Sequence, residues 1–184
     1  MLGYFSRYFS GTRTQPAYPR CSWSGLGFTQ RRTSGFCVCR WRVFALVAVC
    51  FWDVDRARLL AACEAHKSPV TSVDWNQLQG TLVLAASTSA RVKLLDAKNL
   101  DYIMGVFVEH TKEVSQVRWN PNAADEFASV AADGLLKLWD RRVEESVGTL
   151  VDPEDGLEAL VCCDWHKGQD WVLATGDASG RVNV

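Results

Sequence analysis

The sequence repeats itself with a period of about 44 residues, and such a repeat restricts a chain to architectures built from similar stacked units. Three segments align on a tryptophan: HKSPVTSVDWN from His66, HTKEVSQVRWN from His110 and GLEALVCCDWH from Gly156. Downstream, LVLAAS, EFASVA and VLATGD fall into the same register, and ARVKLLD, GLLKLWD and GRVNV follow them. Because three successive columns agree, the repeat indicates one supersecondary unit that is used three times.

Each unit is expected to contain four short strands. In the first unit, apolar or β-branched runs cover 70–75, 82–87, 91–95 and about 102–108, with polar or glycine-containing breaks between them. In the second unit, Ala132-Asp133-Gly134 separates two such runs and predicts a hairpin, because glycine tolerates the positive φ of a tight turn. Apolar residues do not recur at helical spacing over any window, so helices are not expected.

Composition and charge exclude several functional classes. The first 52 residues contain seven arginines and no acidic residue, whereas the remainder contains 13 basic and 21 acidic residues. An acidic folded part repels phosphates, so nucleic-acid binding is not expected. The apolar run VFALVAVCFW from Val43 is about half as long as a bilayer span requires, which predicts a buried strand and no membrane span.

The sequence offers no chemistry for catalysis or for metal binding. Its seven cysteines form no CxxC pair and no zinc-knuckle spacing, and they are interpreted as reduced thiols. The sequence also lacks a phosphate-binding loop and a nucleophile elbow. We therefore expect no enzyme activity, no metal and no cofactor.

A four-stranded unit of 40–45 residues that ends in Trp-Asp is the signature of a β-propeller blade. On these motifs the chain resembles the WD-repeat family from roughly Phe51 to Val184. The resemblance implies an all-β, partial WD-repeat β-propeller with about three four-stranded blades plus the remnant of a preceding one. The blades are expected at about 64–108, 109–152 and 153–184, the last of them incomplete, within a propeller fragment that covers 46–184.

The N-terminal 45 residues match no part of this family. We expect 1–45 to be a disordered or irregular extension, while a presequence and an incorrectly joined coding segment remain open alternatives. Propellers of this family usually close with about seven blades, since a closed ring leaves no unpaired sheet edges. The sequence is therefore interpreted as a piece of a longer protein.

The resemblance also implies a buried hydrogen-bond relay in the middle unit, formed by His110, Ser129, Asp133 and Trp139. A His-Ser-Asp set suggests a catalytic triad, but here the same positions recur from unit to unit, so their role is interpreted as structural. The neighbouring units keep less of this set. The first unit keeps His66 but has Ala85, Ser89 and Leu95 where the middle unit has Ser, Asp and Trp, and the third unit has Gly156, Thr175 and Ser179. Ser89 is expected to accept a weak hydrogen bond from His66.

A finer resemblance points to the peroxisomal import receptors that recognise type-2 targeting signals. It rests on TSVDWN from Thr71, on 109–140 and on 162–184. It implies a cytoplasmic receptor that shuttles to the peroxisome and binds two partners, a peroxisomal co-receptor and cargo proteins with an N-terminal type-2 signal. Such a basic amphipathic helix would bind an acidic propeller rim. Carboxylates in the connections into first strands are the candidate ligands: Glu109, Glu113, Asp155 and Glu158.

An alternative hypothesis uses the same acidic rim for another class of partner. Histone-binding and ubiquitin-ligase adaptor propellers also contain VxWNP and KLWDRR patterns, so the second hypothesis is a WD-repeat scaffold or adaptor that binds histone tails or ubiquitin-ligase substrates. Arg141 and Arg142 follow the Trp-Asp pair and are expected to be solvated on the opposite rim. A measurement of peptide binding, with a type-2 signal and a histone tail, is needed to distinguish the import receptor from the adaptor.

Overall fold

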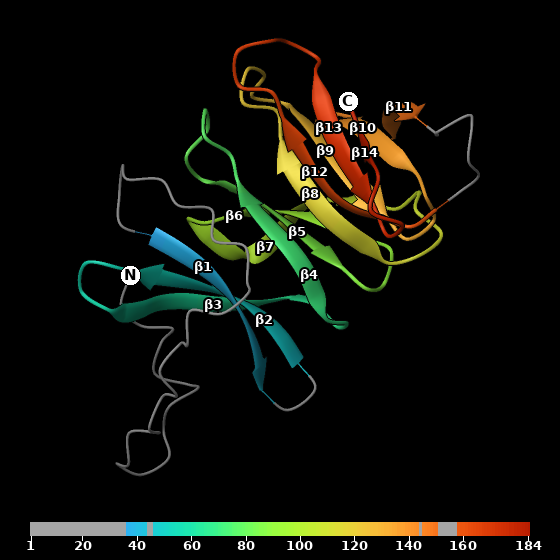
Figure 1. The fold of residues 1–184 in the computed structure, drawn as a ribbon. Coiled ribbons are helices and arrows are strands. Elements are labelled where there is room, and N and C mark those ends of the chain that lie inside the picture. The colour runs from blue at the N-terminus through green and yellow to red at the C-terminus, as the bar shows by residue number, and fades with distance from the viewer. Residues whose placement is uncertain (1–35, 44–45, 144, 151–157) are drawn as a thin grey trace.

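The computed structural model describes residues 36–43, 46–143, 145–150 and 158–184, and the regular elements within them are all strands. The fourteen strands form four antiparallel sheets in chain order. Figure 1 shows the sheets fanned side by side, from β1–β3 at the lower left to β12–β14 at the upper right. This all-β arrangement of successive four-stranded sheets is that of a partial β-propeller, as the repeat predicts.

The two complete sheets each contain four strands in sequential order. The second sheet contains β4 (Val70–Trp75), β5 (Leu82–Ser87), β6 (Val92–Asp96) and β7 (Asn99–Phe107). The third sheet contains β8 (Val114–Trp119), β9 (Glu126–Ala131), β10 (Leu136–Asp140) and β11 (Ser146–Leu150).

The first and fourth sheets each contain three described strands. The first sheet contains β1 (Phe36–Val43), β2 (Leu46–Asp53) and β3 (Arg58–His66). The fourth sheet contains β12 (Leu160–Trp165), β13 (Leu173–Asp177) and β14 (Val182–Asn183).

Strand boundaries in the second sheet follow the predicted ones closely. The predicted segments 70–75 and 82–87 coincide with β4 and β5, and β6 begins one residue later than expected. The last strand begins at Asn99, three residues early, because the carboxylate of Asp96 accepts the Lys98 N–H and closes a tight turn after β6. The loop that joins β6 to β7 is therefore shorter than the sequence predicts.

The strand β1 corrects the expectation of irregular chain up to residue 45. It pairs with β2 over its whole length, from Phe36 opposite Asp53 to Val43 opposite Leu46. The segment FCVCRWRV is rich in aromatic and β-branched residues, and β2 offers it an edge that would otherwise stay unpaired. The remnant of the preceding blade thus comprises three described strands, while residues 1–35 lie outside the described part.

The hydrophobic core lies between neighbouring sheets. The largest cluster joins the second and third sheets, where Phe107, Phe127 and Trp139 are almost completely buried. The Phe107 and Phe127 rings meet edge to face at 4.8 Å, and Phe127 stacks on Trp139 with centroids 5.9 Å apart. Two further clusters fill the spaces between the first and second sheets and between the third and fourth. Each sheet is therefore stabilised by its neighbours.

Hydrogen bonds also join the first strands of successive sheets. The Trp119 N–H donates to the Asp74 carboxylate at 2.7 Å, and the Cys163 N–H donates to the Gln116 side chain at 2.7 Å. Burial raises the pKa of Asp74 to about 6, although its bond from Trp119 acts in the opposite direction. The strands β4, β8 and β12 consequently lie side by side, one per sheet.

The three aligned tryptophans occupy one position in this arrangement. Trp75, Trp119 and Trp165 are the last residues of β4, β8 and β12, the first strand of each sheet. The sequence alignment on tryptophan is thus confirmed as an equivalence in space. It defines which other positions of the three sheets are equivalent.

One rim of the structure is assembled by the same backbone bond in three sheets. In each, the turn between the second and third strands donates an N–H to the connection that leads into the first strand. The pairs are Thr88 N–H to Pro69 O, Ala132 N–H to Glu113 O and Ala178 N–H to Ala159 O, all at 2.9 Å. We call this edge the histidine rim: it comprises the connections 66–69, 109–113 and 158–159 and the turns 88–91, 132–135 and 178–181.

Candidate functional site

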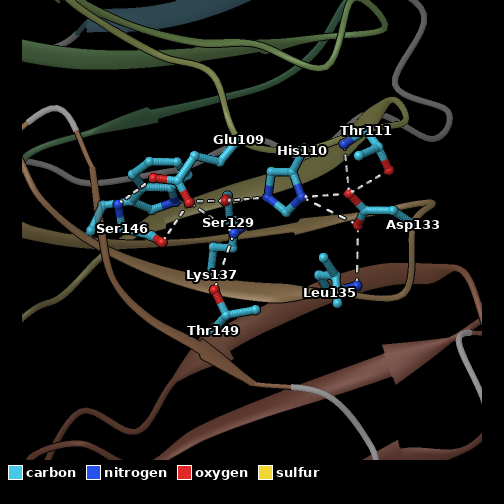
Figure 2. Close-up of polar contacts among 10 residues, drawn as sticks. Glu109, His110, Thr111, Ser129, Asp133, Leu135, Lys137, Ser146 and Thr149 are labelled. Atoms are coloured by element: carbon cyan, nitrogen blue, oxygen red, sulfur yellow. Dashed lines mark hydrogen bonds and ion pairs between the residues drawn. The ribbon is translucent and has the colours of Figure 1, made fainter.

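The third sheet contains a continuous hydrogen-bond relay at the histidine rim (Figure 2). His110 Nδ1 lies 3.0 Å from the Asp133 carboxylate, and His110 Nε2 lies 2.7 Å from the Ser129 hydroxyl. Trp139 Nε1 donates to the same hydroxyl at 2.8 Å. The structure therefore brings together the four residues that the sequence grouped in the middle unit.

The bonds fix the protonation state of the relay. Since Asp133 accepts, Nδ1 of His110 carries the proton, and Nε2 accepts from the Ser129 hydroxyl, which in turn accepts from Trp139. Burial lowers the pKa of His110 below its ordinary value, even though Asp133 favours the charged form. The imidazole is therefore neutral at pH 7.

The Asp133 carboxylate is satisfied from several directions. It accepts the Thr111 N–H at 2.9 Å and the Leu135 N–H at 3.1 Å, in addition to the His110 ring. Burial acts to raise the pKa of Asp133, but the bonds from Thr111 and His110 outweigh this effect and hold the pKa below its ordinary value. The carboxylate thus ties the connection before β8 to the turn after β9.

The relay has no geometry for catalysis. The Ser129 side chain is fully buried, and its hydroxyl is already committed to His110 and Trp139. A nucleophile needs an exposed oxygen and an adjacent site for the reacting carbonyl. The His-Ser-Asp set in this sheet is therefore a structural device that links its strands.

The second sheet satisfies its histidine in another way. His66 Nε2 donates to the Ala85 carbonyl at 2.8 Å, while the Ser89 hydroxyl bonds to Ser87 at 2.6 Å. The expectation that Ser89 accepts from His66 is wrong: among the described residues the Ser89 hydroxyl bonds to Ser87 and forms no hydrogen bond with His66. Leu95 occupies the position of Trp139 and is buried. The second sheet therefore has a shorter relay.

The fourth sheet contributes less to such a relay. Thr175 is buried and pairs in register with Cys163 and Asn183. The turn after β13 is closed by Asp177, whose carboxylate accepts the N–H and hydroxyl of Ser179. Gly156, the counterpart of the histidines, lies outside the described residues.

Glu109 does not point outward from the rim. Its carboxylate accepts the Ser146 N–H at 2.7 Å and the Ser146 hydroxyl at 2.6 Å, and it lies 2.9 Å from the ammonium of Lys137, which also donates to Thr149 (Figure 2). Burial acts to raise the pKa of Glu109, but the bonds from Ser146 and Lys137 lower it to about 2. The structure thus directs this carboxylate into the sheet, where it joins β10 and β11.

Of the other three candidate ligands, two are exposed on the histidine rim and one lies outside the described residues. Glu113 and Glu158 are exposed on the histidine rim, and neither makes an ion pair with any residue that the structure describes. Asp155 lies outside the described residues. Two of the four carboxylates singled out in the sequence are therefore available on one surface.

The opposite rim carries paired arginines. Arg141 contacts Asp125, and Arg142 forms hydrogen bonds to Asp140 in addition to an ion pair with Asp125. Arg142 is largely exposed, as expected for a solvated arginine, whereas the Arg141 side chain is only 24% exposed. These cations bind carboxylates of their own sheet.

Lys137 and Ser146 belong to the polar network, although neither was predicted from the sequence. Lys137 is 6% exposed, which is unusual for lysine and explains why its ammonium requires the Glu109 carboxylate. The available signal was the alternation in LKLWD, since Lys137 and Trp139 share one side of β10.

The described residues offer neither a helical membrane span nor a cluster of metal ligands. None of their segments is a helix of the length and apolarity that a bilayer crossing requires. Within the same ranges, histidine, cysteine and acidic side chains do not gather in groups of three or more that could hold a metal ion.

Comparison with known families follows the repeat seen in the sheets. The model of the WD domain, G-beta repeat, matches residues 57–96 and 102–140. The chain contains WD repeats. The first match spans β3 to β6 and the second spans most of β7 to β10. Each WD repeat therefore supplies the last strand of one sheet and the first three of the next, which interlocks neighbouring sheets.

Curated relatives extend the similarity to about 70% of the WD-repeat chain. It is 31% identical to a ribosome biogenesis protein WDR12 homolog of Caenorhabditis briggsae over 72% of this chain and 29% of the relative. It is 30% identical to the histone-binding protein MSI1 of Saccharomyces cerevisiae over 70% of this chain and 30% of that protein. It is 25% identical to the protein transport protein SEC31 of Kluyveromyces lactis, over 11% of that protein. The chain spans less than a third of the length of each.

Replacement of His110 with glutamine is expected to change the pH dependence of stability. Because the folded-state pKa of His110 lies below its unfolded value of about 6.5, the native histidine contributes its full stability above that pH. Its contribution is lost as the pH falls from about 6.5, since the unfolded chain binds the proton first. The free energies of unfolding of wild type and His110→Gln, measured in urea at pH 5 and pH 7, should converge at the lower pH. Parallel curves would contradict a neutral buried imidazole.

Proposed function

We propose that this WD-repeat chain is part of a scaffold or adaptor that binds a basic segment of a partner protein, of the histone-tail kind, on the histidine rim. The observation that carries the proposal is the exposure of Glu113 and Glu158 on connections of two neighbouring sheets. Both precede a first strand, so both carboxylates belong to the same rim. Two separated negative charges on a rigid rim match an extended peptide with spaced lysines or arginines.

The charge of the chain and its relatives support this choice of ligand. From residue 53 onward the sequence contains 13 basic and 21 acidic residues, which favours the approach of a basic segment. The name of one relative, at 30% identity, describes a histone-binding protein. WD repeats provide a rigid scaffold, and the described relay residues are committed to structure rather than to chemistry.

A peroxisomal type-2 signal is the competing ligand. This hypothesis, together with a co-receptor and shuttling between cytoplasm and peroxisome, rests on the resemblance in three stretches of the sequence alone. None of the relatives named above is described as a peroxisomal receptor. Both kinds of ligand are basic, so the same experiment compares them directly.

The test is fluorescence anisotropy with two labelled peptides, a histone tail and a type-2 signal, titrated with the full chain at several salt concentrations. The histone tail should bind more tightly, and Glu113→Lys should weaken its binding roughly threefold to tenfold, because an exposed ion pair becomes a repulsion. Glu158→Lys should act in the same direction.

The matched control is Glu145→Lys, which reverses an equally exposed charge between β10 and β11, on the opposite rim. It should leave the affinity within about twofold of wild type. Preferential binding of the type-2 signal would favour the import-receptor hypothesis. Equal losses in the rim variants and the control would refute a localised site.

A further inference from the structure

The second and third sheets differ in charge at one equivalent place on the histidine rim. Lys93 pairs in register with Ala85, and Lys137 pairs with Ser129, so the two lysines occupy the same position in their sheets. The ammonium of Lys137 lies 2.9 Å from Glu109. The residue before the histidine in the second sheet is Ala65, which cannot supply this carboxylate.

The turn and the connection next to Lys93 also carry fewer negative charges than their equivalents in the third sheet. The position of Asp133 is occupied by Ser89, and Arg91 replaces Leu135 two residues later. Lys67 follows His66 where a threonine follows His110. The second sheet therefore lacks the carboxylates of Glu109 and Asp133 and has the cations Lys67 and Arg91 where the third has Thr111 and Leu135, while Ser68 stands in place of Lys112.

Lys67 and Arg91 both contribute positive charge at Lys93. Arg91 precedes β6 and its carbonyl accepts the Ser87 N–H, while Lys93 lies two residues further along the same strand. Burial lowers the pKa of Lys93, and the charges of Arg91 and Lys67 lower it further. Two positive charges therefore act on the Lys93 ammonium.

Lys67 and Arg91 are exposed, and Lys93 is half-buried. None of the three forms an ion pair with another residue in the described ranges. The nearest structural comparison, Lys137, shows that an oxyanion is the group that this position of the sheet accommodates. An oxyanion from outside the chain would supply what Glu109 supplies in the third sheet.

We propose that Lys67, Arg91 and Lys93 form a binding site for an oxyanion, a carboxylate or a phosphate, that a peptide segment of a partner protein presents. Charge complementarity identifies this occupant, since three cations at one part of the rim favour an anionic ligand and repel the basic segment proposed for Glu113 and Glu158. The site lies over the second sheet, whereas Glu113 and Glu158 belong to the third and fourth. The histidine rim therefore carries two sites of opposite sign, for two different partner segments.

The test uses three labelled octapeptides that differ at one central residue, which is phosphoserine, glutamate or serine in a glycine-serine context. Anisotropy with the full chain should rank phosphoserine above glutamate and glutamate above serine, because a phosphate carries more charge. Arg91→Gln/Lys93→Gln should weaken the phosphoserine peptide by about tenfold, with two charge-assisted contacts removed. In ¹⁵N spectra, the amides of 89–93 should shift on titration and those of 133–137 should not.

The matched control is Lys98→Gln/Lys112→Gln, which removes the same net charge from exposed positions outside the proposed site. It should retain affinity within about twofold. Binding of the glutamate peptide identifies a carboxylate as sufficient, and binding of the phosphoserine peptide alone identifies a phosphate. Equal affinity for the serine peptide, or equal losses in the two double variants, would overturn the proposal.

Discussion

Replacing Trp139 with alanine is expected to lower the free energy of unfolding by about 3–5 kcal/mol, the largest single effect in the described part of the chain. The indole is 1% exposed and lies between the second and third sheets. Its ring meets Phe107 at 5.4 Å and stacks on Phe127. The substitution leaves a cavity there and removes the N–H that Ser129 accepts. Urea denaturation followed by circular dichroism measures the change.

Two further tryptophan variants separate packing from hydrogen bonding. Trp139→Phe keeps an aromatic ring but removes the N–H, so it should cost less, about 1–2 kcal/mol. Trp171→Ala removes an equally large side chain that is 61% exposed, and it should cost under about 1 kcal/mol. If Trp139→Ala were no more destabilising than Trp171→Ala, the relay would not support the third sheet.

The repeat predicted those elements whose residues face the same surroundings in every unit. A first strand must present alternate side chains to both neighbouring sheets, so VTSVDW and VSQVRW carry a recognisable pattern and their limits agree with β4 and β8. The relay was predicted through the family resemblance, because His110, Ser129, Asp133 and Trp139 stand at the positions of its motif. Its buried polar groups do find partners within the sheet.

Connections between strands were harder to predict, because their side chains follow no period. Glu109 precedes His110 directly, and nothing in the sequence distinguishes a carboxylate that turns outward from one that turns toward Lys137. His66 is a second example. Its partner is the Ala85 carbonyl, and a backbone acceptor cannot be recognised from the sequence because every residue has one. Both errors arise where the direction of a bond depends on tertiary structure.

The segment at the start of the described chain illustrates a limit of repeat alignment. The strand β1 lies one unit before the first aligned histidine, and its sequence shares no motif with β5 or β9. Pairing with β2 requires only strand-forming residues and a free edge, both of which were present. A comparison of motifs therefore misses β1, although β1 belongs to the first sheet.

Glu109→Ala is expected to destabilise the chain by about 2–3 kcal/mol, because it leaves the buried Lys137 ammonium without its carboxylate. The change also removes the acceptor of the Ser146 N–H and hydroxyl, and so loosens β11 from the rest of the sheet. Urea denaturation at pH 7 gives the loss. Glu113→Ala is the matched control, since its carboxylate is exposed four residues away, and it should change stability by less than about 0.5 kcal/mol.

The double variant Glu109→Ala/Lys137→Met decides the cause. Methionine fills the volume of the lysine stem without a charge, so most of the loss should be recovered if an unpaired ammonium is responsible. Peptide anisotropy with the folded Glu109→Ala protein should show unchanged affinity for a basic tail, because this carboxylate is directed toward Ser146 and Lys137. If Glu109→Ala kept wild-type stability and weakened peptide binding, Glu109 would be a ligand-binding residue and not part of the network with Ser146 and Lys137.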